Sequence, residues 1–360
     1  MFGSLAILRP DIGRHSSISD RAMPWSGARS NGSQTMRHGT RGGRKRREQH
    51  EGASSVPFRC HGASDEVETR VGHQGAASRR PGLCDVVGTD HLGDQFAPLL
   101  ALLSAVEATR SLRVGSFVLA NDFRSPVLLA KEVATLDVLS GGRFELGLGA
   151  GWWKREYEQA GIAFDPASVR VSRMEEALQI LKGLLANDPL TFSGRHYTVS
   201  HLNGLPKPIQ RPHPPLLIGG GGKRVVSFAA REAGIVGLDV KARADGSGLD
   251  WTTATAAATL QKVEWIRQAA GNRFNELELN LISYAVVVTN DRQQAVQQLT
   301  RRWEVSEEQV IGMPHCLVGT VEQISDVLRE RREQYGISYI VVPERSMEVF
   351  APVVSHLTGT

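Results

Sequence analysis

Four consecutive glycines, Gly219 to Gly222, give the clearest chemical signal in this sequence. Three aliphatic residues (216–218) precede them, and a helical pattern runs from Val225 to Ala233. This order predicts a strand, a glycine loop and a helix. Exposed N–H groups at a helix start bind anions, and glycine lets a phosphate approach the backbone closely. The run is compatible with a phosphorylated cofactor or substrate, and also with an ordinary flexible turn.

Polar residues follow two other strand-like runs. The run at 85–92 ends in Asp90 and His91, and the run at 112–121 ends in Asn121. His91 could give a proton or a hydrogen bond to a redox ring, with Asp90 orienting the imidazole. The same pair could also do no more than cap the end of the strand.

Aromatic residues follow the strand-like run at 144–151. Trp152 and Trp153 could form a wall against an aromatic cofactor, although we expect at least one of them to serve in packing. Glu156 and Tyr157 are expected on a surface turn, outside any acid–base chemistry. The sequence contains no metal-ligand spacing, nucleophile elbow or complete P-loop.

Strands and helices that alternate along the chain must position these residues. Seven strands are predicted from Asp85 onward, beginning near 85, 112, 144, 215, 235, 277 and 337. Helical patterns lie between them, and one of these has Ser125 as a possible cap and Pro126 in its first turn. The alternation predicts a parallel sheet covered by helices, either a (β/α)8 barrel or a doubly wound sheet. The first strand–helix turn lacks G-x-G-x-x-G, which disfavours the doubly wound sheet.

Charge divides the chain into two parts. Residues 1–83 hold 14 Lys and Arg against 7 Asp and Glu, a net +7, whereas the whole chain carries +4, which leaves −3 for the remainder. The basic run at 41–47 could bind nucleic acid or be a solvated charge run, and the acidic remainder argues against a nucleic-acid enzyme. No apolar stretch is long enough to span a membrane. The three widely spaced cysteines fit a reducing cytoplasm.

Several long stretches together resemble the bacterial luciferase-like family of flavin- and deazaflavin-dependent oxidoreductases. The sequence of these stretches is most similar to the branch of the family that uses coenzyme F-420. The resemblance covers roughly 85–345 and implies a (β/α)8 TIM barrel, hydride transfer at a deazaflavin and a homodimer. The stretches that carry it are TDHLGDQFAP (89–98), the run 114–165, RHYTV (195–199) and PPLLIGGGGKRVVSFAAREAG (214–234).

The resemblance also implies a set of site residues. Asp90 and His91 correspond to the acid–histidine pair that faces the deazaflavin ring. Near Val118 and Leu119 the family often has a non-prolyl cis peptide behind the ring. The other implied cofactor contacts are Asn121, Gly149, Gly151, Trp152, Gly219, Gly220, Gly221 and Gly222, and the weaker substrate positions are Phe96 and Lys241.

The chain departs from the family pattern in two ways. Sugar-phosphate dehydrogenases of the family have a carboxylate near Trp152 and a Trp near Gln95 and Phe96, so that activity is not expected here. The text before Asp85 also lacks the expected first strand and helix. We therefore divide the chain in two. Residues 1–84 are expected to be disordered, with mistranslation as a hypothesis for their origin. Residues 85–360 are expected to form a barrel whose strands at 85–92 and 337–344 have unpaired edges.

Taken together, the residues predict a cytoplasmic oxidoreductase that transfers hydride between coenzyme F-420 and a small organic substrate. An FMN-dependent monooxygenase that consumes oxygen is the alternative within the same fold. A defective barrel without catalysis, or a nucleic-acid-binding protein that uses residues 37–47, are the alternatives from other classes. No metal, nucleic-acid partner or membrane partner is expected in the leading interpretation, and the substrate is not identified by the sequence.

Overall fold

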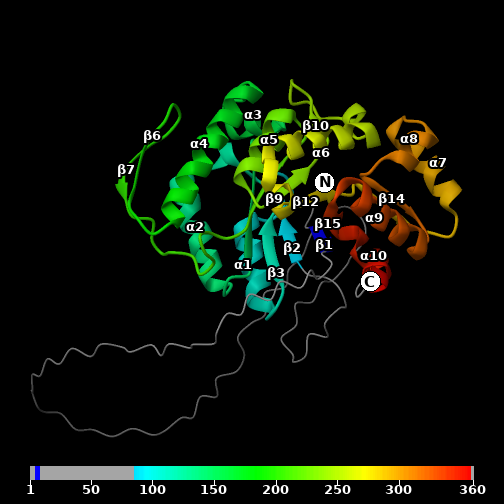
Figure 1. Cartoon of the computed structure of the whole chain (residues 1–360), viewed down its shortest axis with the longest axis horizontal. Coiled ribbons are helices and arrows are strands. Elements are labelled where there is room, and N and C mark those ends of the chain that lie inside the picture. Colours follow the sequence, from blue (N-terminus) through cyan, green and yellow to red (C-terminus); the bar gives the residue numbers. More distant parts are fainter. Residues whose placement is uncertain (1–4, 9–84, 358–360) are drawn as a thin grey trace, which may run out of the picture.

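The computed structural model describes residues 5–8 and 85–357, and within them eight strands form a closed ring. Helices surround the central strands (Figure 1). Each strand pairs with the next around the ring, and β3 pairs with β5 to close it. The result is the TIM-barrel architecture expected from the alternation of strands and helices. In ring order the strands are β1 (Leu5–Leu8), β2 (Asp85–Gly88), β3 (Arg113–Ser116), β5 (Phe144–Gly149), β8 (Leu216–Gly220), β9 (Ile235–Leu238), β12 (Glu278–Ile282) and β15 (Ile337–Pro343).

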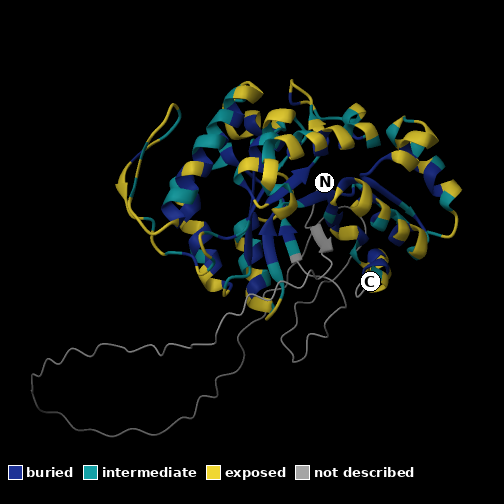
Figure 2. Cartoon of the chain, viewed as in Figure 1, coloured by how far each residue is buried: buried dark blue, intermediate teal, exposed yellow. Residues whose placement is uncertain are grey.

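Apolar side chains fill the space between this ring and its helices. All six residues of β5 and all four of β9 are buried, as expected for parallel strands with both faces covered. Figure 2 shows the strands buried at the centre and the helices exposing only their outer faces. The helices are α1 (Pro98–Ala108), α2 (Pro126–Leu139), α3 (Lys154–Ala160), α4 (Ala167–Leu185), α5 (Lys223–Glu232), α6 (Ala256–Ala270), α7 (Arg292–Trp303), α8 (Glu307–Gly312), α9 (Val321–Tyr335) and α10 (Met347–Leu357).

Side-chain caps fix the starts of several helices. Thr320 and Gln323 form a reciprocal capping box at α9, and Ser306 and Gln309 form another at α8. As the sequence suggested, Ser125 is the N-cap residue of α2 and Pro126 lies in its first turn, but the Ser125 side chain makes no capping hydrogen bond. None of the helices described for 85–357 combines the length and apolarity needed to cross a bilayer.

The expectation of two unpaired barrel edges is wrong. Strand β1 lies between β2 and β15 and pairs with both, with Ala6 opposite Val86 on one side and Val342 on the other. It runs antiparallel to both neighbours, whereas the first strand of an ordinary (β/α)8 barrel is parallel. Outside 5–8, the segment 1–84, which was expected to be disordered, lies beyond the described residues.

A break in the second predicted strand shapes one end of the barrel. The run at 112–121 forms β3 and then β4 (Leu119–Ala120), and β4 continues along β5. The Phe117–Val118 peptide between them is cis. The expectation of a non-prolyl cis peptide near Val118 and Leu119 is therefore confirmed, at the bond that precedes Val118.

Three small two-stranded sheets lie outside the ring and were not predicted. The polar insert at 190–213 contains the hairpin of β6 (Leu190–Ser193) and β7 (Thr198–Leu202). Strands β10 (Lys241–Ala242) and β11 (Leu249–Asp250) form a second pair. The run at 277–289, expected as one strand, divides into β12 and β13 (Ala285–Val288), and β13 pairs in parallel with β14 (Cys316–Gly319).

Buried polar and aromatic groups connect this outer sheet to the barrel. Tyr284 lies between the rings of Trp251 and His315, at centroid distances of 5.1 and 5.7 Å, and Trp251 stacks on Trp303 at 5.8 Å. The Nδ1 atom of His315 lies 2.8 Å from the carbonyl oxygen of Ile282. His315 is fully buried, and this burial lowers its pKa to about 3.

His315 therefore makes the protein sensitive to acid. Between pH 6.5 and pH 3 the unfolded chain binds a proton at this histidine and the folded chain does not, so the free energy of unfolding falls as the pH drops. His315→Asn keeps a donor to Ile282 but removes the titration. Urea unfolding across this window should show a shallower pH slope for His315→Asn, by up to about 1.4 kcal/mol per pH unit. His356→Asn, at an exposed position of α10, is the control, and equal slopes in all three proteins would contradict the assignment.

Candidate active site

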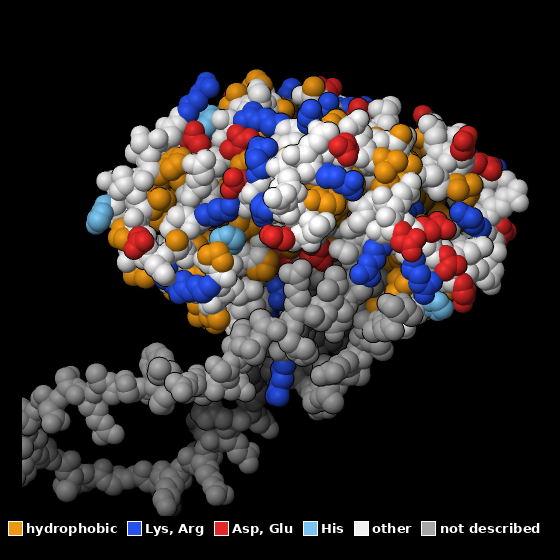
Figure 3. Space-filling view, in the orientation of Figure 1, with side chains coloured by type: hydrophobic (Ala, Val, Ile, Leu, Met, Phe, Trp, Pro, Cys, Tyr) orange, Lys and Arg blue, Asp and Glu red, His pale blue; other side chains and the backbone are white. Residues whose placement is uncertain are grey.

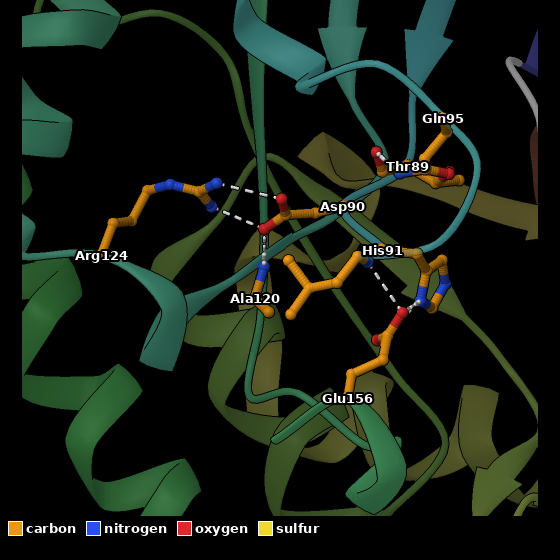
Figure 4. A network of polar contacts seen from close by, with 8 residues as sticks. Thr89, Asp90, His91, Gln95, Ala120, Arg124 and Glu156 are labelled. Atoms are coloured by element: carbon orange, nitrogen blue, oxygen red, sulfur yellow. Dashed lines mark hydrogen bonds and ion pairs between the residues drawn. The ribbon is translucent and has the colours of Figure 1, made fainter. Parts of the chain in front are cut away.

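A buried carboxylate organises the carboxyl end of β2. Asp90 is 8% exposed, and its Oδ2 atom accepts hydrogen bonds from the Ala120 backbone nitrogen at 2.8 Å and from Arg124 at 2.5 Å. A second guanidinium nitrogen of Arg124 donates to Oδ1 at 3.0 Å (Figure 4). A bidentate arginine is a strong partner for a carboxylate. Asp90 therefore joins the end of β2 to β4 and does not orient His91, which corrects that expectation.

Glu156 holds His91 instead. Its two carboxylate oxygens lie 3.0 and 3.2 Å from the Nδ1 atom of His91, and Oε1 also accepts from the Leu92 backbone nitrogen at 2.9 Å (Figure 4). Glu156 is 4% exposed and Tyr157 is 1% exposed, so the expectation of a surface turn is wrong for both. The carboxylate therefore fixes the orientation of the His91 ring.

Two indoles lie beside this histidine. Trp152 and Trp153 stack at 5.8 Å between ring centroids with an interplanar angle of 13°. Both meet His91 edge to face, at 5.9 and 5.8 Å. We expected at least one of the two indoles to serve in packing. Both rings are half-buried and both contact the imidazole of His91, so the structure does not single out either of them as the packing residue.

Glycines at two strand ends make room for Val118. A β-carbon added at Gly149 would lie 2.6 Å from a methyl carbon of Val118, and one added at Gly219 would lie 3.4 Å from its other methyl carbon. Val118 therefore packs across the ends of β5 and β8 directly after the cis peptide, half-buried at this end of the barrel. Leu119, in contrast, is fully buried in the core and lines no open surface.

The rest of the glycine loop divides between packing and open space. An added β-carbon would lie 2.7 Å from Val225 at Gly220, and 2.4 Å from the Lys241 backbone nitrogen at Gly221. At Gly222, which precedes α5, it would meet nothing within 4 Å, and no side chain caps that helix. The strand, loop and helix predicted from the sequence are confirmed, and of the four glycines Gly222 is the one where an added β-carbon meets no described atom within 4 Å.

A second polar network supports Asn121. Asn121 is 2% exposed, and its side-chain amide donates to the Tyr197 hydroxyl at 3.3 Å. The neighbouring Asp122 forms an ion pair with Arg173 at 2.9 Å and accepts from the Tyr157 hydroxyl at 3.4 Å. Burial, assisted by Asp122, raises the pKa of Tyr157, so this hydroxyl stays protonated.

Three further predicted positions are Gly151, Phe96 and Lys241. Gly151 has a φ of +73°, and a β-carbon there would lie 1.8 Å from the Tyr157 hydroxyl, so this glycine is required by packing. Phe96 is 50% exposed in the loop after β2. Lys241 is exposed on β10, next to Gly221. The structure brings together Asp90, His91, Val118, Asn121, Gly149, Trp152 and Gly219 at one end of the ring.

Sequence reasoning missed Glu156, Arg124 and Tyr197. Glu156 stands in the charged run KREYEQ, where nothing distinguishes a buried carboxylate from an exposed one. Tyr197 lies in the RHYTV stretch that carried part of the resemblance, so this stretch was the available signal. The basic run at 37–47 lies outside the described residues, and on the face shown in Figure 3 acidic and basic side chains are interspersed.

Comparisons with known proteins place this site in context. The sequence profile of the luciferase-like monooxygenase family matches residues 74–339. A similar curated protein is the FMNH2-dependent dimethylsulfone monooxygenase of Pseudomonas putida, 34% identical over 40% of this chain and 39% of the relative. The F-420-dependent glucose-6-phosphate dehydrogenase of Amycolatopsis mediterranei is 31% identical over 39% of this chain and 42% of the relative.

Solved structures share the fold at low sequence identity. The coenzyme F-420-dependent tetrahydromethanopterin reductase of Methanopyrus kandleri has a TM-score of 0.61 at 17% identity and covers 77% of this chain and 92% of the reductase. An F-420-dependent secondary alcohol dehydrogenase has a TM-score of 0.60 at 18% identity, over 75% of this chain and 89% of the dehydrogenase. The matches to the curated relatives span less than half of their length. The family profile, however, covers most of this chain, which belongs to the luciferase-like monooxygenase family.

Proposed function

We propose that this chain binds coenzyme F-420 at the carboxyl end of its barrel and transfers hydride between this cofactor and a small organic substrate. The observation that carries the proposal is the His91 imidazole, fixed through Nδ1 by the buried Glu156 and bordered by two indoles. Deazaflavin, when bound, supplies the carrier of the hydride. Relatives that use either F-420 or FMNH2 support a cofactor of this chemical class.

His91 supplies the proton site that hydride transfer to or from oxygen-bearing carbon requires. Oxidation of an alcohol, for example, releases a hydride from carbon and a proton from the hydroxyl. The Nδ1 atom of His91 faces Glu156, and this imidazole is the group at which the substrate proton would be accepted or returned. The Glu156 carboxylate stabilises the positive charge of the imidazolium that results.

The glycines and the start of α5 fit the remainder of such a cofactor. Val118 presents a small apolar surface beside Gly149 and Gly219, which suits the face of a flat ring system. The start of α5 has backbone N–H groups without a side-chain cap, next to open space at Gly222. A phosphate group suits that position because it accepts hydrogen bonds from several amides at once.

The second candidate is an FMN-dependent monooxygenase, and one observation favours it. The Pseudomonas putida relative uses FMNH2 and is 34% identical to this chain over 144 residues. The isoalloxazine of FMN and the deazaflavin of F-420 have similar outlines and both carry a ribityl phosphate. The open space at Gly222 and the apolar face of Val118 therefore accept either ring system.

Titration of the purified chain with F-420 and, separately, with FMN distinguishes these candidates. We expect tight binding of F-420, seen as a change in its fluorescence, and no retention of FMN on gel filtration. Tight FMN binding with oxygen consumption would establish the monooxygenase instead. A folded chain that binds neither cofactor would show that the barrel is not catalytic.

The role of Glu156 is tested by Glu156→Gln, which keeps the shape of the side chain and removes its charge. We expect turnover with F-420 to fall by about 100-fold or more, in the range of general acid–base contributions, while the cofactor still binds. Glu158→Gln is the matched control, because Glu158 is exposed on the same helix and pairs with Lys154 at the surface. A loss in both variants, or in neither, would argue against a positioning role for Glu156.

The glycine loop is tested by two neighbouring substitutions. Gly221→Ala forces a methyl group against the backbone at 240–241 and should lower the free energy of unfolding by about 1–3 kcal/mol in urea. Gly222→Ala meets no atom and should stay within about 0.5 kcal/mol of the parent protein. We expect the second variant to bind the cofactor more weakly, because its methyl group occupies the proposed phosphate position. Unchanged cofactor affinity in Gly222→Ala would move the phosphate elsewhere.

A further inference from the structure

A small cavity lies outside the barrel mouth, between β14 and the helices α7, α8 and α9. It opens to solvent and shares no lining residue with the His91 site. Most of the lining is apolar, with Val296, Val310 and Ile324 buried around it. Its polar lining groups are the guanidinium groups of Arg292 and Arg331 and the Cys316 thiol.

Arg331 is held at this cavity with part of its guanidinium unused. It is 7% exposed, and Nη2 donates to the carbonyl oxygens of Met313 at 3.1 Å and Cys316 at 2.7 Å. The Nη1 atom of the same group is buried and has no hydrogen-bond partner among the described residues. Burial lowers the pKa of Arg331 to about 10, so the group remains positively charged at neutral pH.

Arg292 places a second incomplete guanidinium against the same cavity. It is the first residue of α7, and its Nε atom is buried without a partner among the described residues. Among the described residues that line the cavity, none has an acidic side chain. Buried donors without acceptors are costly, and a buried positive charge without a counter-charge costs more.

We propose that this cavity binds a small oxyanion, a phosphate or carboxylate group, between Arg292 and Arg331. An oxyanion offers acceptors to Nη1 of Arg331 and Nε of Arg292 at once and neutralises the buried charge. Guanidinium groups match the spacing of phosphate and carboxylate oxygens. The proposal concerns a site separate from the cofactor and does not depend on the proposed function.

Thermal unfolding with increasing phosphate, at constant ionic strength balanced with sodium chloride, measures this binding. We expect the Tm of the parent protein to rise with phosphate and to saturate. Arg292→Gln and Arg331→Met should each raise the half-saturating phosphate concentration about tenfold or more, as expected for the loss of one charged hydrogen bond. Sulfate and acetate, titrated in the same way, separate phosphate-like from carboxylate ligands.

Two exposed arginines give matched controls. Arg301→Gln on α7 and Arg332→Met on α9 remove the same charge from the same helices, at positions that do not line the cavity. Both should keep the phosphate response of the parent protein. Since Arg331 also supports two backbone carbonyls, Arg331→Met can fail to fold, and Arg292→Gln then decides.

Cys316 provides a local readout inside the cavity. It is 4% exposed, and burial raises the pKa of its thiol to about 12. With Cys60→Ser and Cys84→Ser it becomes the only thiol of the chain, which has three cysteines. Phosphate should slow its labelling by a disulfide reagent, and the further change Arg292→Gln should remove this protection.

Three results would overturn the proposal. One is a Tm response to phosphate no larger than the response to chloride. Another is an equal response in Arg292→Gln and in the parent protein, as binding at the glycine loop would produce. The third is Cys316 labelling that phosphate does not change.

Discussion

The buried carboxylate of Asp90 is the interaction on which the candidate site depends. A carboxylate so little exposed to water must be satisfied by protein donors, and it receives them from Arg124 and from the backbone of Ala120. These bonds tie the end of β2 to β4, directly after the cis peptide at Val118. The next residue after Asp90 is His91, so the same bonds hold the backbone from which the imidazole extends, while Glu156 orients the ring. Asp90 and Glu156 thus divide two tasks: one anchors the backbone and the other holds the ring.

Close packing at the ends of the neighbouring strands β5 and β8 also shapes the site. Val118 fills the space that Gly149 and Gly219 leave, so β4, β5 and β8 meet through one small side chain. A side chain at Gly149 would displace Val118 from this position. The shape of the barrel mouth therefore results from the close packing of Val118 against the backbone at Gly149 and Gly219. The polar groups are added to the surface that these three residues form.

Much of this arrangement could be predicted from the sequence, and the exceptions have physical reasons. Apolar runs such as 144–149 predicted the parallel strands because burial on both faces selects aliphatic residues. The glycine run and His91 were found because their residue types are chemically distinctive. Glu156 was missed because the sequence does not show whether a charged side chain is buried. Its burial depends on how α3 packs against the loop after β2. Strand β1 was missed because four apolar residues, Leu5–Leu8, acquire meaning only through partners at β2 and β15 that are remote in sequence.

The stacked tryptophans give the protein two optical reporters at separate places. Four of the six indoles in the chain form two nearly parallel pairs, Trp152 with Trp153 beside His91 and Trp251 with Trp303 beside Tyr284. Stacked rings couple their electronic transitions, so each pair contributes a near-ultraviolet circular dichroism band that depends on its mutual angle. Replacing Trp303 with Phe would remove the band of the Trp251–Trp303 pair and leave the band of the Trp152–Trp153 pair at the barrel mouth. Structural changes beside His91 could then be followed by circular dichroism in the unlabelled protein, separately from changes in the outer sheet.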